Sequence, residues 1–323
     1  MKEDLKAHFQ GVVSALARGD VIPLLGAGAN LCDRSIGAKW EPGSRALVHH
    51  TGELVNYLAQ RFSYPDPNRE LARVAQYAAV KRGTGPLYAD LREIFARDYP
   101  TTTLHRFLAA LPHKLGSKGY PRRSDEDSRR YVVVTTNYDD LLERAFAAEG
   151  EACHVVWYLA EGKRQGHFLH RPPGGETVLI KKPNKYHGLA ADQQPIVLKI
   201  HGTVDRQGKD NSFVITEDDY IDYLSYLASP DLIPIPLPGI LRERHLLFLG
   251  YSLKDWNLRV ILNRIWEEQE LGWQFWAIQL QPDQVDQEFW HHRGVDILDL
   301  PLADYVAALA AEIDHLEPAE TER

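Results

Sequence analysis

The sequence predicts an α/β fold built on a doubly wound, mostly parallel, Rossmann-like sheet. A helical insertion follows the first strand, and a small irregular or β-rich insertion comes later in the chain. Two observations support this fold class. Six short runs rich in β-branched residues and leucine are spread along the chain, and several are continuously apolar, which is typical of parallel strands covered on both faces. Helical patterns lie between these runs, so strands and helices alternate.

Each predicted strand is a short run dominated by apolar residues. The six runs are Val21–Leu25, Tyr131–Thr135, Ile196–His201, His245–Leu249, Gln274–Leu280 and Val295–Leu300. A helix over Asp4–Arg18 comes before the first strand, because its apolar residues fall on one stripe. Four helical patterns separate the first strand from the second: Gly52–Arg61, Asn68–Lys81, Pro86–Asp98 and Thr103–Leu111. Three further helices are expected over Asp139–Glu149, Leu253–Gln269 and Pro301–His315.

Three segments do not fit a regular element. Ser117–Arg130 is rich in glycine, proline, serine and charge, which predicts an exposed loop. Cys153–Pro195 holds several glycines and prolines with one strand-like piece, Thr177–Lys181. Pro230–Gly239 contains four prolines and is incompatible with a regular helix or a central strand. We therefore expect one domain over residues 1–316, with a helical insertion at about 45–115, a small insertion at about 153–195, and a flexible tail at 317–323.

The composition narrows the classes of function. A formal net charge of −8 argues against a nucleic-acid-binding surface, which needs clustered lysine and arginine. Neither cysteine, Cys32 or Cys153, lies in a CxxC pair, which excludes a four-cysteine zinc site, and isolated cysteines fit a reducing compartment. No run approaches the roughly 18 apolar residues of a membrane span. These features predict a cytoplasmic protein with no metal, no membrane association and no direct nucleic-acid partner.

The first motif is the turn Gly26-Ala27-Gly28 after the first strand. Two glycines there let the backbone approach a pyrophosphate, and free amides can point at anionic oxygens. The third glycine of the dehydrogenase fingerprint is missing, because Leu31 occupies its position. The motif therefore fits dinucleotide binding better than it fits a dehydrogenase, and a tight turn without a ligand remains the alternative.

Three further motifs also follow predicted strands. Thr136-Asn137-Tyr138-Asp139 leads into a helix, where an aspartate can cap the helix and a carboxamide can hold a ribose hydroxyl or a water. His201-Gly202 places an imidazole, a general base near neutral pH, at a strand end. Gly250-Tyr251-Ser252 has the shape of the first motif, with Ser252 as a helix cap in the alternative. Because the carboxyl ends of parallel strands line one crevice, all four motifs fit a single nucleotide site.

In this order the motifs GAG, TNYD, HG and GYS resemble those of the sirtuin superfamily, in particular the prokaryotic sirtuin-like NAD hydrolases of antiviral defence. The resemblance extends from about Val21 to Leu309. It implies that Gly26, Ala27 and Gly28 contact the phosphates of NAD.

The resemblance also assigns roles to the other motifs. It implies that Asn137 holds ribose and water, that Asp139 orients the nicotinamide end, and that His201 is the catalytic histidine. Thr136 belongs to the expected cofactor-binding set. Gly250 and Ser252 correspond to the turn near the adenine ribose and the phosphates.

Two departures from the sirtuin pattern bear on the reaction. The zinc-binding cysteines of protein deacylases are missing between Thr203 and Arg244, and no GIPDFR-like signature follows the glycine turn. The resemblance thus implies an NAD+ hydrolase that yields nicotinamide and ADP-ribose, or a cyclic form, without a metal. An NAD-dependent deacylase and a non-catalytic NAD or ADP-ribose sensor remain alternatives.

A free NAD hydrolase would be toxic to its host, which suggests a latent effector of bacterial anti-phage defence. The expected partners are NAD, further copies of the chain, and a sensor or ATPase module. The aromatic pattern around Trp256 and Trp266 fits either an interface or a helix that covers the sheet.

Overall fold

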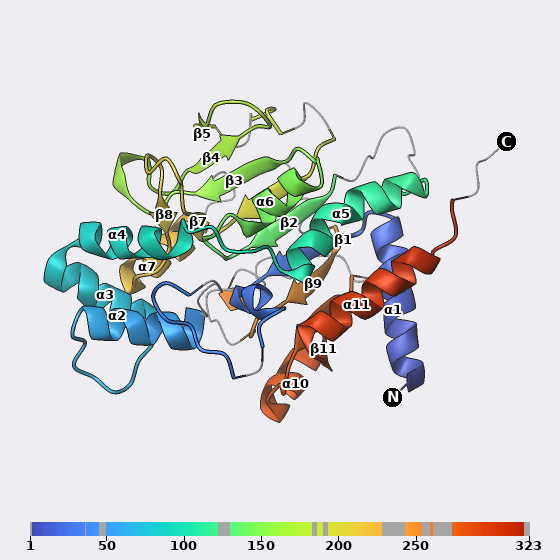
Figure 1. Cartoon of the computed structure of the whole chain (residues 1–323), viewed down its shortest axis with the longest axis horizontal. Helices are drawn as coiled ribbons and strands as arrows, with labels where there is room; N and C mark the ends of the chain where they lie inside the picture. The colour runs from blue at the N-terminus through green and yellow to red at the C-terminus, as the bar shows by residue number, and fades with distance from the viewer. Residues whose placement is uncertain are drawn as a thin grey trace.

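The computed structural model of the protein describes residues 2–35, 37–44, 50–121, 130–182, 186–189, 193–227, 243–253, 259–260 and 273–319. Nine strands form one sheet in the order β11-β10-β9-β1-β2-β6-β3-β4-β5 (Figure 1). They are β1 (Val21–Leu25), β2 (Val132–Thr135), β3 (His154–Tyr158), β4 (Phe168–Arg171), β5 (Val178–Ile180), β6 (Ile196–Lys199), β9 (His245–Leu249), β10 (Phe275–Gln279) and β11 (Val295–Asp299). All neighbours from β11 to β3 pair in parallel, whereas β3-β4-β5 pair antiparallel.

A short hairpin and the helices complete the described fold. The hairpin pairs β7 (Gly202–Thr203) with β8 (Ser212–Phe213). The α-helices are α1 (Lys2–Ala17), α2 (Val55–Arg61), α3 (Leu71–Arg82), α4 (Thr84–Phe95), α5 (Thr103–Ser117), α6 (Leu141–Ala148), α7 (Glu217–Leu227), α10 (Gln284–His291) and α11 (Leu302–His315). Single turns of other helix types are η1 (Ala27–Leu31), η2 (His50–Leu54) and η3 (Gly162–Arg164).

Helices cover both faces of the sheet. In β2, Val133 packs into a core shared with α1, α5, α6 and α11, while its neighbours Val132 and Val134 pack on the opposite face, toward Tyr223 of α7 and Trp290 of α10. Side chains alternate between the faces of a strand, so a strand covered on both sides must be apolar at every position. Each fully buried valine of this kind contributes about 1.5–3 kcal/mol. This double burial explains the continuous apolar runs in the sequence.

A third core lies in the helical segment between β1 and β2. Helices α2, α3 and α4 bury residues such as Leu58, Val74 and Leu91 among themselves. The same core includes Tyr138, from the segment that follows β2, and Phe213 of β8 (Figure 1). The insertion is therefore packed against the segment that follows β2 and the hairpin that follows His201.

The predicted fold class is confirmed, and the six predicted strands all form. Two details differ. Strand β6 ends at Lys199, so His201 lies in the turn after the strand rather than within it. Residues 153–195 are β-rich as expected, but β3, β4 and β5 extend the main sheet at one edge instead of standing apart from it. The run His154–Tyr158 is fully buried, so β3 has the same continuous apolar pattern as the other parallel strands.

Several segments with sequence predictions lie partly or wholly outside the described residues. Ser117, expected in a loop, is the last residue of α5, and most of that predicted loop lies outside the described residues. The same holds for most of the predicted helix Leu253–Gln269, and for all of Pro230–Gly239. At the start of the tail, the Ala319 amide donates to the Lys118 carbonyl at 2.8 Å. None of the helices in the described parts of the chain has the length and apolar character needed to span a bilayer.

Candidate functional site

The four sequence motifs follow four strands that are neighbours in the sheet. The order β9-β1-β2-β6 places Gly250, Gly26, Asn137 and His201 after consecutive parallel strands, at one edge (Figure 1). With about 4.8 Å between neighbouring strands, the four strand ends span roughly 14 Å. The chain leaves β1 toward β2 on one side and later returns to place β9 on the other side, so β1 and β9 form the topological switch point. Ligands of doubly wound sheets bind at this point.

The glycine turn is packed directly against the turn that follows β9. The Gly26 amide donates to the Leu249 carbonyl at 3.1 Å, and the Gly28 amide donates to the Gly250 carbonyl at 2.8 Å. A Cβ atom on Gly28 would lie 2.7 Å from the Gly250 oxygen. From the sequence, this space and these amides were expected to face a pyrophosphate. In the structure, both amides and the space beside the glycines are used by the neighbouring turn, so any phosphate contact must come from other groups of the turn.

Asn137 links the end of β2 to the same glycine turn. Its side-chain nitrogen Nδ2 donates to the Gly26 carbonyl at 3.1 Å, and its backbone amide donates to Thr135 Oγ1 at 3.0 Å. The Thr136 amide donates to the Leu25 carbonyl at 3.1 Å. With Nδ2 held in this way, the carboxamide has a fixed orientation and its oxygen is the group left to act as an acceptor. The expected neighbourhood of Asn137 and the glycine turn is therefore present.

Asp139 is a buried carboxylate at the start of α6. Its Oδ1 accepts the Leu141 amide at 3.1 Å, as in the helix-capping alternative, while its Oδ2 accepts Asn30 Nδ2 at 3.0 Å. Burial raises the pKa of Asp139, and the positive charge of Lys199 acts in the opposite direction. Asn30 Oδ1 is buried and has no hydrogen-bond partner among the described residues. The aspartate thus serves both the helix and the glycine turn, which carries Asn30.

His201 lies in the turn after β6 and is held by aromatic rings. Its imidazole meets Tyr220 and Tyr223 of α7 edge to face, with centroid distances of 5.6 and 5.4 Å, and the residue is 3% exposed. The next residue, Gly202, has φ +90°, and a Cβ there would lie 2.2 Å from the Ser212 oxygen. The close approach of β7 and β8 at this point explains why glycine follows the histidine.

The turn after β9 positions two further predicted residues. Gly250 has φ +68°, and Gln279 Nε2 donates to the Tyr251 carbonyl at 3.0 Å. Ser252 is exposed. Most of the helix that Ser252 was expected to cap lies outside the described residues, so the capping alternative stays a prediction.

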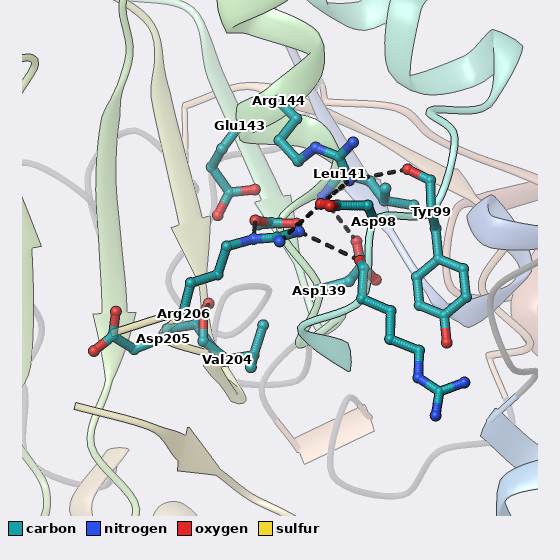
Figure 2. Close-up of polar contacts among 12 residues, drawn as sticks. Asp98, Tyr99, Asp139, Leu141, Glu143, Arg144, Val204, Asp205 and Arg206 are labelled. Atoms are coloured by element: carbon teal, nitrogen blue, oxygen red, sulfur yellow. Dashed lines mark hydrogen bonds and ion pairs between the residues drawn. The ribbon is translucent and has the colours of Figure 1, made fainter. Parts of the chain in front are cut away.

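An ion-pair network joins the site to the helical insertion. Arg206, in the turn after β7, donates through Nε and Nη2 to the carboxylate of Asp140 and through Nη1 to Asp98 at 2.8 Å. Figure 2 shows Arg206 and Arg144 on either side of Asp98, with Asp139 and Glu143 nearby. Hydrogen bonds to Asp140 raise the pKa of Arg206 above its ordinary value. The network links the segments after β6 and β2 to the end of α4.

Comparison with known proteins identifies the family. A family model described as a SIR2-like domain matches residues 131–298, more than half of the chain. The chain belongs to the SIR2-like family. The match covers the TNYD, HG and GYS motifs, so the resemblance inferred from the sequence is confirmed.

Several relatives of this SIR2-like chain are larger proteins. Defense-associated sirtuin 2 of Bacillus subtilis is 25% identical over 71% of the chain and 19% of that protein. NAD(+) hydrolase ThsA is 32% identical in Acinetobacter baumannii, over 41% of the chain and 21% of that protein. In Bacillus cereus ThsA is 26% identical, over 66% of the chain and 36% of that protein. The chain thus spans about a fifth to a third of the length of these relatives. The solved structure of a Sir2 homolog–NAD complex aligns with 95% of the chain at 13% identity and a TM-score of 0.38.

Several residues of the candidate site could not be found from the sequence. Asn30, Lys199 and Arg206 each contact the segment after β2 from a distant part of the chain. For the tyrosines that contact His201, the sequence does contain a clue: positions 220 and 223 are three residues apart, so they fall on the same face of a helix. No cluster of three His, Cys, Asp or Glu side chains suited to a metal was found among the described residues.

A buried histidine beside the glycine turn predicts loss of stability in acid. His105 Nδ1 accepts the Thr102 amide at 3.3 Å, and Thr102 Oγ1 donates to the Ala29 carbonyl of η1 at 3.3 Å. Burial lowers the pKa of His105 from 6.5 to about 4. The unfolded chain therefore binds a proton that the folded chain does not, so stability falls as pH decreases from about 6.5 to about 4. We expect a contribution from His105 of about 3 kcal/mol.

Urea unfolding between pH 4 and 7 measures this effect. The variant His105→Gln cannot be protonated, so its free energy of unfolding should depend less on pH than that of the parent. Part of the dependence should remain, because burial also lowers the pKa of His8 to about 4. Equal slopes for parent and variant would show that His105 is not the titrating group.

Proposed function

We propose that the protein is an NAD+ hydrolase that cleaves the nicotinamide–ribose bond and releases nicotinamide and ADP-ribose, or a cyclic form. The supporting observation is the arrangement of the four motifs. An imidazole, a carboxamide and a carboxylate follow neighbouring strands and flank the glycine turn at the switch point. Several SIR2-like relatives are named NAD(+) hydrolases, which supports the same reaction.

The chemistry needs few groups. In NAD+ the ribose is bonded to the positively charged pyridinium nitrogen of nicotinamide. When this bond breaks, nicotinamide leaves as a neutral molecule, so no strong acid is required. The ribose acquires oxocarbenium character, as in other glycosidic cleavages. The protein must hold the ribose, exclude bulk water and deliver one nucleophile. A general base is worth about 10²–10⁴-fold, and positioning supplies much of the remainder.

Each predicted residue has a place in this reaction. We assign proton removal from a ribose hydroxyl or from the attacking water to His201. The carboxamide oxygen of Asn137 orients that hydroxyl or water, because Nδ2 is already held by Gly26. Asp139 receives the amide of nicotinamide or fixes the segment that does so. Ala27 and Thr136, with Gly26 and Gly28, line the phosphate end, and Gly250 and Ser252 line the adenine ribose.

Product analysis tests the proposal. Purified protein, at concentrations at which it assembles and with candidate partner modules, should convert NAD to nicotinamide and ADP-ribose, or its cyclic form, by mass spectrometry. A second incubation with an acetylated peptide should give the same products, whereas O-acetyl-ADP-ribose would identify a deacylase. Binding of ADP-ribose by calorimetry without any turnover would instead identify a sensor.

We further propose that the activity serves antiviral defence and is latent until the chain assembles. One relative is named a defence-associated sirtuin, and uncontrolled NAD cleavage would harm the host. Light scattering alongside turnover, across a range of protein concentrations and with candidate partner modules, measures this dependence. A monomer with full activity at every concentration would contradict latency.

A further inference from the structure

Lys199, the last residue of β6, carries a fully buried ammonium group. Its side chain is 0% exposed. A charged amine inside a protein costs several kcal/mol unless it is paired and hydrogen-bonded. Nζ donates to the Asp139 carbonyl oxygen and pairs with Glu143 Oε1 at 3.0 Å. The second oxygen of Glu143 is buried without a hydrogen-bond partner among the described residues, so Lys199 is the cation that this carboxylate faces.

The position of Lys199 connects two parts of the proposed site. It lies two residues before His201, and its contact falls on the main chain of Asp139, two residues after Asn137. One ammonium therefore ties the strand that presents the imidazole to the segment that presents the carboxamide and the carboxylate. Glu143, in the first turn of α6, anchors the ammonium from the helix side.

We propose that Lys199 is a positioning residue for the reaction: it holds Asn137 and Asp139 in register with His201. This inference rests on the proposed NAD hydrolysis. A misplacement of about 1 Å in a reacting group can reduce turnover roughly 100-fold. The Lys199 charge also opposes the rise in the pKa of Asp139 that burial causes, and so favours the ionised carboxylate.

A simpler role for Lys199 is to neutralise buried Glu143, and paired variants separate the two roles. Lys199→Met leaves Glu143 buried and unpaired, so the melting temperature should fall by roughly 10 °C. In Lys199→Met/Glu143→Gln the uncompensated charge is gone, and the melting temperature should return toward that of the parent. Both variants lack the ammonium contact with Asp139. We therefore expect kcat to remain about 10- to 100-fold below the parent in both, with KM within about threefold.

Backbone hydrogen exchange supplies a readout that does not depend on turnover. The Asn137 and Leu141 amides flank the contact, and they should exchange faster in the double variant than in the parent. The Ala277 amide in β10 should be unaffected. Lys114→Met removes the surface ion pair to Asp314, 2.9 Å long, and should change neither kcat nor exchange at these sites.

Two results would overturn the proposal. Either the double variant regains parental kcat together with its stability, or the exchange of both amides matches the parent. A parent that does not cleave NAD in the assembled form and with candidate partner modules would refute the proposed function instead, and the exchange experiment would still decide whether Lys199 positions the segment.

Discussion

His201→Ala should lower NAD turnover by at least about 100-fold while the protein stays folded. Imidazole is the side-chain type best suited to act as a general base near neutral pH, and loss of a general base typically costs about 10²–10⁴-fold. Its ring is buried and packs edge to face against Tyr220 and Tyr223 of α7. Removal of the ring should cost only the roughly 0.5–3 kcal/mol typical of single substitutions.

Two further variants separate chemistry from packing. His201→Gln keeps most of the volume and a hydrogen-bonding amide but cannot act as a base, so its turnover should be as low as that of His201→Ala. His154→Ala is the matched control, because His154 is 1% exposed and begins β3, at the amino ends of the parallel strands and away from the carboxyl ends that carry the motifs. It should lose stability and keep kcat within about threefold of the parent. Initial rates with saturating NAD, together with thermal unfolding, measure both effects, and parental rates in His201→Gln would exclude the histidine as the base.

The location of the site could be predicted from the sequence because it depends on a general property of parallel sheets. Each motif was visible as an apolar run followed by glycine, asparagine or histidine. The strand order β9-β1-β2-β6 could not be read from the chain, but the carboxyl ends of parallel strands share an edge in any order. The helices around the first insertion were also predictable, since their apolar periodicity is a local signal.

The contacts that support the site could not be predicted, because they join residues far apart in the chain. Lys199 is the last residue of an otherwise apolar strand, where a lysine usually marks a solvent-exposed end. Its partners Asp139 and Glu143 are 60 and 56 residues away. The expectation for the space beside the glycines was wrong for the same reason, because the group they approach comes from a distant part of the chain. Small residues at Gly26 and Gly28 correctly indicated a close approach, but the approaching group is the backbone of Gly250.

Gly250→Ala should destabilise the protein by about 3 kcal/mol and weaken binding of ADP-ribose at least about tenfold. A side chain at φ +68° costs about 1–2 kcal/mol. The new Cβ would also lie 2.3 Å from the Ala29 nitrogen and 2.5 Å from the Gly28 carbonyl carbon, so two backbone turns must move apart. Overpacking of this kind typically adds about 1–3 kcal/mol. These two turns lie at the switch point, where we place the phosphate end of the site. Their separation should therefore weaken binding of ADP-ribose.

Gly294→Ala is the control that isolates this contact. Gly294 has φ +74°, close to that of Gly250, but a Cβ there meets no atom within 4 Å. The control should therefore show the backbone cost alone, about 1 kcal/mol, and bind ADP-ribose like the parent. Urea unfolding and calorimetry on the three proteins give the comparison. If Gly250→Ala and Gly294→Ala are equally stable and bind ADP-ribose equally well, the close packing of the first and fourth motifs does not form the site. If Gly250→Ala alone loses both stability and binding, the contact between Gly28 and Gly250 holds the phosphate end of the site together, because the two variants share the same backbone strain.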